Sequence, residues 1–238
     1  MRSARSSRPR STSSCSTAIT ERRPRGGLFD LFLTSHLLIL VCYLTAPFPA
    51  AHNDALDVYA YIASQPTSFD LSHTTLSGFS AGGNLAMGLA VALPASAIKG
   101  LISIYGNPAI YEVPPPPPFS TFSAGLILPA FIRTFFYQSL ILPGVDRMDL
   151  RLSPALAGGE RWPEEVFVAC GEADSLWQPG KDLVAKLEKD GKKVGWMSVE
   201  DSAHAFDKAG MGMSKETKAR VDAMYGQAVA LVKRCVTQ

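Results

Sequence analysis

Short apolar runs of strand length alternate along the chain with longer segments in which apolar residues recur every three or four positions. This alternation is typical of a parallel sheet whose strands are joined by helices. The most continuous runs, 100–105 and 166–170, are those expected of strands buried on both faces. The predicted strands are 37–44, 74–78, 100–105, 166–170 and 194–199. The pattern therefore predicts an α/β fold with a mostly parallel sheet and helices on both of its faces.

Four segments carry helical periodicity. Residues 82–93 are small and apolar, which suits a helix packed closely on a sheet. Gly191 follows the third helical segment as a terminator, and Ser214 stands where an N-cap would begin the last one. The predicted helices are 50–64, 82–93, 178–190 and a long C-terminal helix after Ser214.

The first 27 residues differ from the rest in composition. Residues 1–26 hold seven Arg and one acidic residue, a charge of +6, so the net charge of +2 leaves −4 on the remainder. An Arg- and Ser-rich segment without apolar periodicity predicts a disordered tail, and an organelle transit peptide is the alternative. We therefore divide the chain into a basic tail, 1–27, and a partial α/β domain, 28–238.

Residues 28–46 are strongly apolar and follow the basic tail, which is also the pattern of a signal-anchor. Asp30 and His36 interrupt the segment and leave 37–44 as its clean apolar part. That part is too short for the ~20-residue helix that crosses a bilayer, but it suits a strand. We expect a buried strand rather than membrane association, and a cytoplasmic protein, with organelle targeting and membrane anchoring as alternatives.

The overall composition argues against several classes of protein. With 47% hydrophobic and 18% charged residues the chain can bury a full core. Its mildly acidic body does not favour a nucleic-acid partner. The four cysteines are widely spaced, so neither a structural zinc site nor a disulfide framework is indicated. Because no phosphate loop or metal-ligand spacing occurs either, we expect no cofactor and no metal.

A serine between glycines follows the predicted strand 74–78. Residues 78–82 read Gly-Phe-Ser-Ala-Gly, the spacing of a nucleophile elbow with Ser80 at its tip. A sharp strand-to-helix turn strains the backbone, and the glycines remove Cβ atoms that would collide there. The motif lies between a short strand and a helix of small residues, which is the context it needs. A glycine-rich turn with an exposed serine is the alternative.

A serine hydroxyl is a poor nucleophile at neutral pH without a base and an acid that orients the base. In α/β folds that carry a nucleophile elbow, the acid and then the histidine follow the serine along the chain. His204 is the only histidine after the elbow in this sequence. The acid is expected after strand 166–170, because functional loops lie at the carboxyl ends of parallel strands. We assign this role to Asp174, with Glu172 and Asp201 as alternatives.

These motifs together resemble the hormone-sensitive-lipase-like family, also called the α/β-hydrolase fold-3 family, of esterases and lipases. The matching pieces are APFPAAHNDALDVYAYI (46–62), LSGFSAGGNLAMGLA (76–90), LSPALA (152–157), CGEADSLWQPG (170–180) and EDSAHAF (200–206). The resemblance implies a serine hydrolase that acts on a small or medium uncharged carboxylic ester. It also implies that Ser80, Asp174 and His204 form the catalytic triad and that Ala81 donates one oxyanion N–H.

The sequence departs from this family at one motif. The family carries an HGGG-type loop before the elbow, whose N–H groups complete the oxyanion hole, and no such motif occurs here. The loss of one oxyanion donor costs roughly 100- to 1000-fold in turnover. The first strands of the family's sheet are also missing from the pattern. The alternative function is therefore a weak or inactive hydrolase-like fragment that serves as a binding module, and a peptidase or acyltransferase is less favoured.

Residues 113–150 depart from the strand–helix alternation and form a candidate lid or acyl-pocket segment. Five consecutive prolines, 114–118, are followed by several Phe and Leu side chains. The alternatives are a core helix kinked at Pro129 and a proline tract that binds a partner. The residues expected to contact the substrate are Phe79 and Gly82 in the elbow, with Phe122 and Leu126 in this segment.

Overall fold

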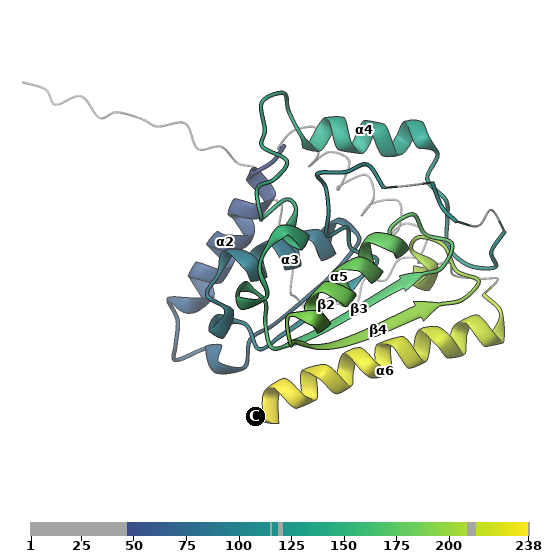
Figure 1. Cartoon of the computed structure of the whole chain (residues 1–238). Helices are drawn as coiled ribbons and strands as arrows, with labels where there is room; N and C mark the ends of the chain where they lie inside the picture. Colours follow the sequence, from purple (N-terminus) through teal and green to yellow (C-terminus); the bar gives the residue numbers. More distant parts are fainter. Residues whose placement is uncertain (1–46, 115, 119–120, 209–212, 238) are drawn as a thin grey trace, which may run out of the picture.

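In the part of the chain that the structure describes, the sheet contains four parallel strands in the order in which they occur in the sequence (Figure 1). The computed structural model describes residues 47–114, 116–118, 121–208 and 213–237. Four of the predicted strands are confirmed to within one residue at each end, and the fifth, 37–44, lies outside the described residues. The observed strands are β1 (Thr75–Phe79), β2 (Gly100–Ile104), β3 (Glu165–Gly171) and β4 (Lys193–Val199).

The four predicted helices are present, and a further helix precedes β3. Ser214 caps the last helix as predicted, because its Oγ accepts a hydrogen bond from the N–H of Thr217 at 3.0 Å. The helices are α2 (Ala50–Ala63), α3 (Ala81–Ala92), α4 (Ala130–Leu140), α5 (Trp177–Lys189) and α6 (Lys215–Thr237). Short 3-10 helices occupy Leu71–His73, Ala95–Ala97, Pro154–Leu156, Gly159–Arg161 and Phe206–Lys208.

Helices cover both faces of the sheet, which confirms the predicted fold class. Helices α3 and α5 pack on one face and α6 packs on the other (Figure 1). Successive side chains of a strand point to opposite faces, so Leu101 of β2 joins the core under α3 and α5 while Ile102 joins the core under α6. This two-sided burial explains why the central strands read as nearly continuous apolar runs.

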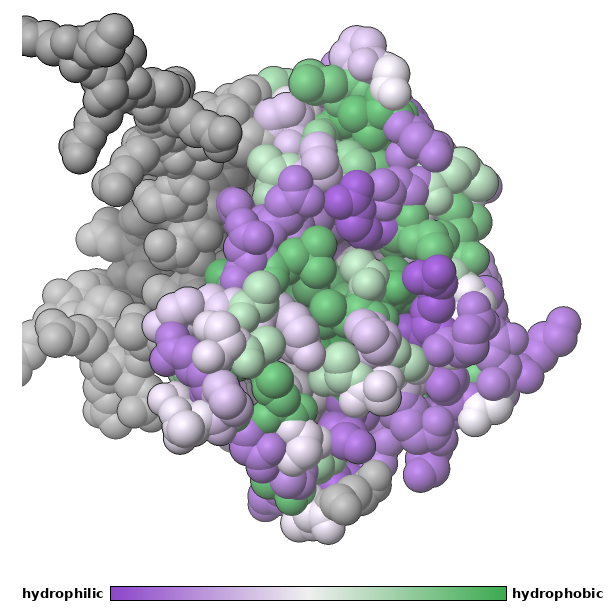
Figure 2. Space-filling view, turned by 90° about the vertical axis from the view of Figure 1, so that its left-hand side faces the viewer, coloured by the Kyte–Doolittle hydropathy of each residue, from purple (hydrophilic) through white to green (hydrophobic). Residues whose placement is uncertain are grey.

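Helix α2 is attached to the outside of α3 rather than to the sheet. The face of the molecule seen in Figure 2 lies on the α2 side, and apolar and polar side chains are interspersed there. Val58 and Tyr61 of α2 are exposed. The one fully buried residue of this helix is His52, which lies against Gly88 of α3.

Burial lowers the pKa of His52 to about 4 from an ordinary value near 6.5, and the positive charge of Arg151 acts in the same direction. Between pH 6.5 and about 4, His52 is protonated in the unfolded chain but neutral in the folded chain. We therefore expect the free energy of unfolding to be highest above pH 6.5 and to fall by about 3 kcal/mol as the pH drops to about 4.

Urea unfolding of the wild type and of His52→Gln at several pH values measures this loss. The variant cannot take up the proton, so its curve of unfolding free energy against pH should be flatter between pH 6.5 and 4. Parallel curves for the two proteins would contradict the assignment to His52.

Helix α4 lies beyond the carboxyl ends of the strands, on the far side of the sheet from α6 (Figure 1). It begins directly after Pro129, and none of its residues is buried. The alternative of a core helix kinked at Pro129 is therefore wrong, because the proline precedes the first turn and no residue of the helix is buried. Within the described part of the chain, no helix is both long and apolar enough to span a bilayer. Residues 28–46 lie outside that part.

Candidate active site

The turn between β1 and α3 holds Ser80 in a strained backbone conformation, with φ of 50° and ψ of −120°. A non-glycine residue seldom adopts a positive φ, and such strain is found mainly at functional sites. The N–H of Ser80 donates to the carbonyl oxygen of Ile104 at 3.0 Å, which fastens the turn to β2. The side chain is thereby presented at the carboxyl edge of the sheet.

Glycine at position 78 is a steric requirement of this turn. A Cβ atom there would lie 2.1 Å from the carbonyl oxygen of Gly82, a backbone atom that cannot rotate away. The backbone of Gly82 therefore packs directly against Gly78 beneath the elbow.

We expect Gly78→Ala to unfold the elbow or to destabilise the protein by several kcal/mol, in the range of severe core mutations (about 4–5 kcal/mol). The matched control is Gly226→Ala in α6, where an added Cβ meets nothing within 4 Å. There, alanine should raise the free energy of unfolding by about 0.5–1 kcal/mol. Thermal unfolding of both variants tests the pair, and equal effects would contradict the steric argument.

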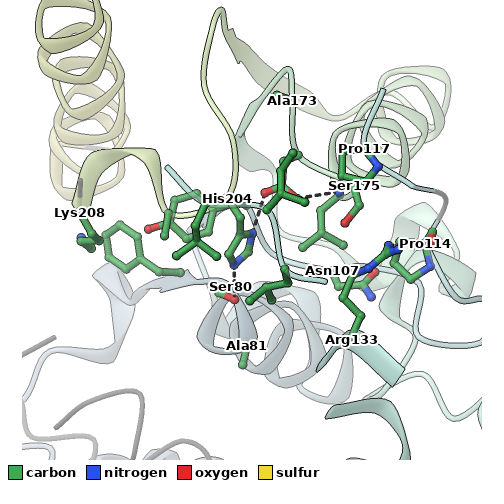
Figure 3. Close-up of a pocket in the computed structure, with 18 of the residues that line it drawn as sticks. Ser80, Ala81, Asn107, Pro114, Pro117, Arg133, Ala173, Ser175, His204 and Lys208 are labelled. Atoms are coloured by element: carbon green, nitrogen blue, oxygen red, sulfur yellow. Dashed lines mark hydrogen bonds and ion pairs between the residues drawn. The ribbon is translucent and has the colours of Figure 1, made fainter. Parts of the chain in front are cut away.

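The three residues predicted to form a triad are connected by two hydrogen bonds, and Figure 3 shows the contact between Ser80 and His204. Ser80 Oγ is 2.8 Å from His204 Nε2, and His204 Nδ1 is 2.7 Å from Asp174 Oδ2. The Asp174 side chain is 2% exposed and that of His204 is 15% exposed. The other carboxylate oxygen of Asp174 accepts the N–H of Leu176 at 3.0 Å. The acid is therefore fixed by the backbone that begins α5.

Two loops meet to hold the acid and the histidine. The N–H of Ala173 donates to the carbonyl oxygen of Ser202 at 2.9 Å, which ties the loop after β3 to the loop after β4. Gly171 is needed where the two loops cross, since its Cβ would stand 2.3 Å from the Ser202 oxygen. On the other side, the N–H of Leu126 donates to the carbonyl oxygen of His204 at 2.9 Å. The histidine loop is thus held between two segments.

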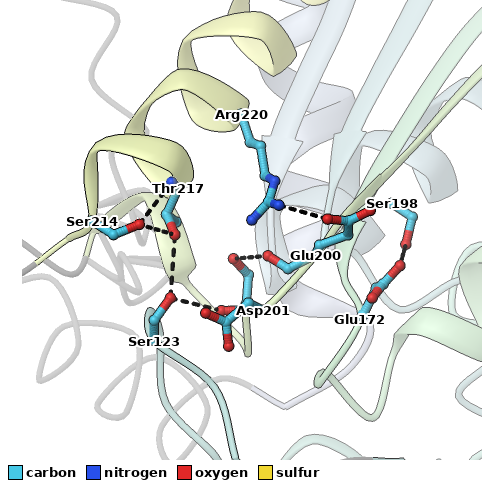
Figure 4. Close-up of polar contacts among 9 residues, drawn as sticks. Ser123, Glu172, Ser198, Glu200, Asp201, Ser214, Thr217 and Arg220 are labelled. Carbon is cyan, nitrogen blue, oxygen red and sulfur yellow. Dashed lines mark hydrogen bonds and ion pairs between the residues drawn. The ribbon is translucent and has the colours of Figure 1, made fainter.

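Hydrogen bonds hold the two alternative acids elsewhere, Glu172 through its carboxylate and Asp201 through its backbone carbonyl oxygen (Figure 4). Glu172 accepts a hydrogen bond from Ser198 Oγ at 3.0 Å, and that oxygen in turn accepts the indole N–H of Trp177 at 2.7 Å. The carbonyl oxygen of Asp201 accepts the N–H of Ser123 at 3.1 Å. These contacts stabilise the surrounding loops, and the carboxylate beside the imidazole is that of Asp174.

Ala81 is the first residue of α3 and lies beside Ser80 (Figure 3). The first N–H groups of a helix have no partner within the helix, and the helix dipole adds partial positive charge at that end. Negative charge that develops on a substrate oxygen near Ser80 would therefore be stabilised here.

A cavity of about 940 Å³ surrounds the Ser80–His204 pair. In Figure 3, Lys208 lies on one side of this pair, and Asn107, Arg133 and Pro114 lie on the other. The wall is formed by the elbow, the loops after β2, β3 and β4, the inner side of α4 and the first turns of α6. Within the described residues, no group of three or more His, Cys, Asp or Glu side chains is arranged to hold a metal ion.

Two of the four residues expected to contact the substrate line this cavity and two do not. Phe79 and Leu126 belong to the wall. Gly82 is not part of it, because its backbone packs against Gly78 beneath the turn. Phe122 also lies outside it; the chain beside it, at Ser123, is bonded to Asp201 and directed towards α6. Of the four predicted contact residues, Phe79 and Leu126 thus line the cavity, whereas Gly82 and Phe122 lie outside its wall.

Among the other polar residues that line the cavity, Tyr105, Asp207 and Lys208 were not predicted from the sequence. Tyr105 directly follows β2, and Asp207 comes three positions after His204. Their positions at the carboxyl ends of strands were a usable signal, since all such loops meet at one edge of a parallel sheet.

A parallel sheet with a serine on a strained strand-to-helix turn is the architecture of the α/β hydrolases. A family model described as the α/β hydrolase fold matches residues 34–208, most of the chain. The chain belongs to the α/β-hydrolase fold-3 family, as the motifs predicted.

Among characterised proteins, the chain is 29% identical over 182 residues to the ethyl acetate hydrolase of Pseudomonas putida. The match covers 73% of this chain and 57% of that protein. The esterase of Pyrobaculum calidifontis has a similar fold, with a TM-score of 0.64 at 23% identity over 80% of this chain and 62% of that one. A hormone-sensitive lipase from a metagenome library has a TM-score of 0.59 at 21% identity, over 77% and 62%. The chain thus spans less than two thirds of the length of these relatives.

Proposed function

We propose that this protein hydrolyses carboxylic esters through an acyl intermediate on Ser80. The observation that carries the proposal is the continuous chain of contacts from Ser80 Oγ through the imidazole of His204 to the buried carboxylate of Asp174. The strained elbow and the helix that starts at Ala81 support it further. The ethyl acetate hydrolase to which the chain is similar suggests the same bond type.

The arrangement suits a two-step acyl transfer. With Nδ1 protonated and bonded to Asp174, Nε2 of His204 accepts the Ser80 proton while Oγ attacks the ester carbonyl carbon. The carbonyl electron pair moves onto oxygen, where the N–H of Ala81 stabilises the charge. His204 then gives the proton to the departing alkoxide, and the ester C–O bond breaks. Water attacks the acyl-Ser80 in the same way and releases the carboxylic acid.

The cavity wall favours small or medium uncharged esters. Phe79, Leu126, Ile127 and Leu128 contribute apolar surface to the cavity that Ser80 and His204 also line. An apolar wall gains about 25 cal/mol for each Å² of apolar substrate surface that leaves water. Esters whose acyl chain is just long enough to cover this apolar surface should therefore give the highest kcat/KM.

Purified protein tested with p-nitrophenyl acetate, butyrate and octanoate, and with a fluorophosphonate probe, decides the proposal. We expect hydrolysis above the buffer rate, with saturation, and labelling of one serine. The absence of both hydrolysis and labelling would favour the alternative of an inactive, hydrolase-like binding module. The sequence feature that favours this alternative is the lack of an HGGG motif, which limits the oxyanion donors.

A further inference from the structure

A buried carboxylate lies beside the candidate triad and takes no part in the mechanism above. The side chain of Asp207 is 0% exposed. It accepts hydrogen bonds from Tyr105 Oη at 2.6 Å, from Lys208 Nζ at 2.6 Å and from the hydroxyl of Tyr225. These donors come from three places: the end of β2, the 3-10 helix after His204, and α6. Asp207 therefore joins the base loop to two elements that are distant in sequence.

Burying a carboxylate such as that of Asp207 costs free energy, so its position in the protein interior calls for an explanation. A charged carboxylate taken out of water is tolerated only when it is paired and fully hydrogen-bonded. Burial, and then the negative charge of Asp207, raise the pKa of Tyr105 well above its usual range. Burial, and then the hydrogen bond to Asp207, raise the pKa of Tyr225. Both hydroxyls therefore stay protonated at neutral pH and can donate to Asp207.

The Tyr105 side chain connects Asp207 to the imidazole of His204. The ring centroids of Tyr105 and His204 are 4.9 Å apart, at an interplanar angle of 59°. Tyr105 has a φ of 42°, a conformation that a large side chain seldom adopts. Its N–H bond to the Ala169 oxygen, at 2.7 Å, holds the backbone, and the bond to Asp207 holds the far end of the ring. The ring is thereby fixed against one side of the histidine.

The same carboxylate also reaches the elbow. Lys208, which is paired with Asp207, places its Nζ 4.1 Å from the ring centroid of Phe79. Phe79 immediately precedes Ser80, and its ring lies 5.9 Å from that of Tyr105. A cation over an aromatic face is attractive by about 0.5–2 kcal/mol. The network therefore touches both the side chain next to the candidate base and the side chain next to the candidate nucleophile.

We propose that Asp207 is a positioning residue that, through Tyr105, holds the imidazole of His204 in line with Ser80. The inference rests on the proposed esterase function but concerns a different residue. A displacement of reacting groups by about 1 Å can cost on the order of 100-fold in rate. The loss of this network should therefore lower kcat more than it changes KM.

The decisive comparison uses two tyrosines that donate to the same carboxylate. Tyr105→Phe and Tyr225→Phe each remove a hydrogen bond to Asp207, and Tyr225→Phe also removes the bond that Lys208 Nζ donates to Tyr225 Oη at 3.4 Å. Of these two tyrosine rings, that of Tyr105 packs against His204. We expect similar falls in Tm for the two variants. For Tyr105→Phe and for Asp207→Asn we expect kcat on p-nitrophenyl butyrate to drop roughly 10- to 100-fold with KM changed less than threefold. For Tyr225→Phe we expect kcat to drop less than threefold.

Equal losses of kcat in the two tyrosine variants, or losses only in Tm, would overturn the proposal in favour of a purely structural role. A second readout does not depend on turnover. In ¹⁵N-histidine-labelled protein, the ring resonances of His204 should shift or broaden in Asp207→Asn and Tyr105→Phe and stay unchanged in Tyr225→Phe. If the wild type proves inactive, this spectroscopic comparison still tests the positioning role. Unchanged His204 resonances in all three variants would overturn it.

Discussion

Replacing Ser80 with alanine is expected to reduce ester hydrolysis to the rate of buffer alone and to abolish fluorophosphonate labelling. The change removes a single oxygen, the atom that lies 2.8 Å from His204 Nε2. In serine hydrolases with a complete triad, loss of the nucleophile costs on the order of 10⁶-fold in kcat. Because the elbow is fastened through backbone atoms of β2 and α3, the fold should persist, and thermal unfolding of the variant should resemble that of the wild type.

The control for this variant is Ser77→Ala, three positions earlier in β1. Ser77 is exposed and lies outside the cavity wall, so its loss should leave hydrolysis and labelling close to those of the wild type. Initial rates with p-nitrophenyl butyrate, measured on the three proteins at equal concentration, give the comparison. Equal rates for the wild type and Ser80→Ala would show that another group performs any hydrolysis that is seen.

Asp174→Asn should lower kcat by roughly 10⁴-fold. An asparagine amide donates where the carboxylate accepts, so it favours the imidazole tautomer with the proton on Nε2. That tautomer cannot take the Ser80 proton. The variant also lacks the negative charge that stabilises the imidazolium formed during attack. Because the substitution is nearly isosteric and the site is 2% exposed, the local packing should be retained.

Glu172→Gln provides the matched control, because Glu172 is the neighbouring acid and is bonded to Ser198 rather than to His204. We expect its kcat to remain within about threefold of the wild type, whereas Asp174→Asn falls by four orders of magnitude. A steady-state comparison of kcat for the two variants, with circular dichroism to verify folding, measures this. A larger loss of kcat in Glu172→Gln than in Asp174→Asn would assign the role of the acid to Glu172.

The regular part of the fold was predictable because two physical patterns repeat along it. Strands buried on both faces must be apolar throughout, and 100–105 and 166–170 have this composition. The elbow was predictable because Gly78 has no tolerated substitute beside the Gly82 carbonyl. The histidine was predictable by elimination, since His204 alone follows the elbow.

Other features depend on tertiary contacts that no local pattern encodes. Asp174 and Glu172 lie on one turn, and only the three-dimensional course of the chain decides which of them meets the imidazole. The partnership of Asp207 with Tyr105 joins residues 102 positions apart. The proline-rich segment was ambiguous for a similar reason: its aromatic residues would suit either a core or a cavity wall, and Phe136 lines the cavity whereas Phe131 is 71% exposed.

The order of the strands has a consequence for how the protein is made. Ser80 follows the first described strand, whereas His204 arrives with the last, so 124 positions separate the two atoms that must meet. Domains emerge from the ribosome with the N-terminal part first. Until β4 has docked against β3, a nascent chain carries a serine with no base beside it. On the proposed mechanism, a chain truncated on the C-terminal side before β4 would retain Ser80 without His204 and should not hydrolyse esters.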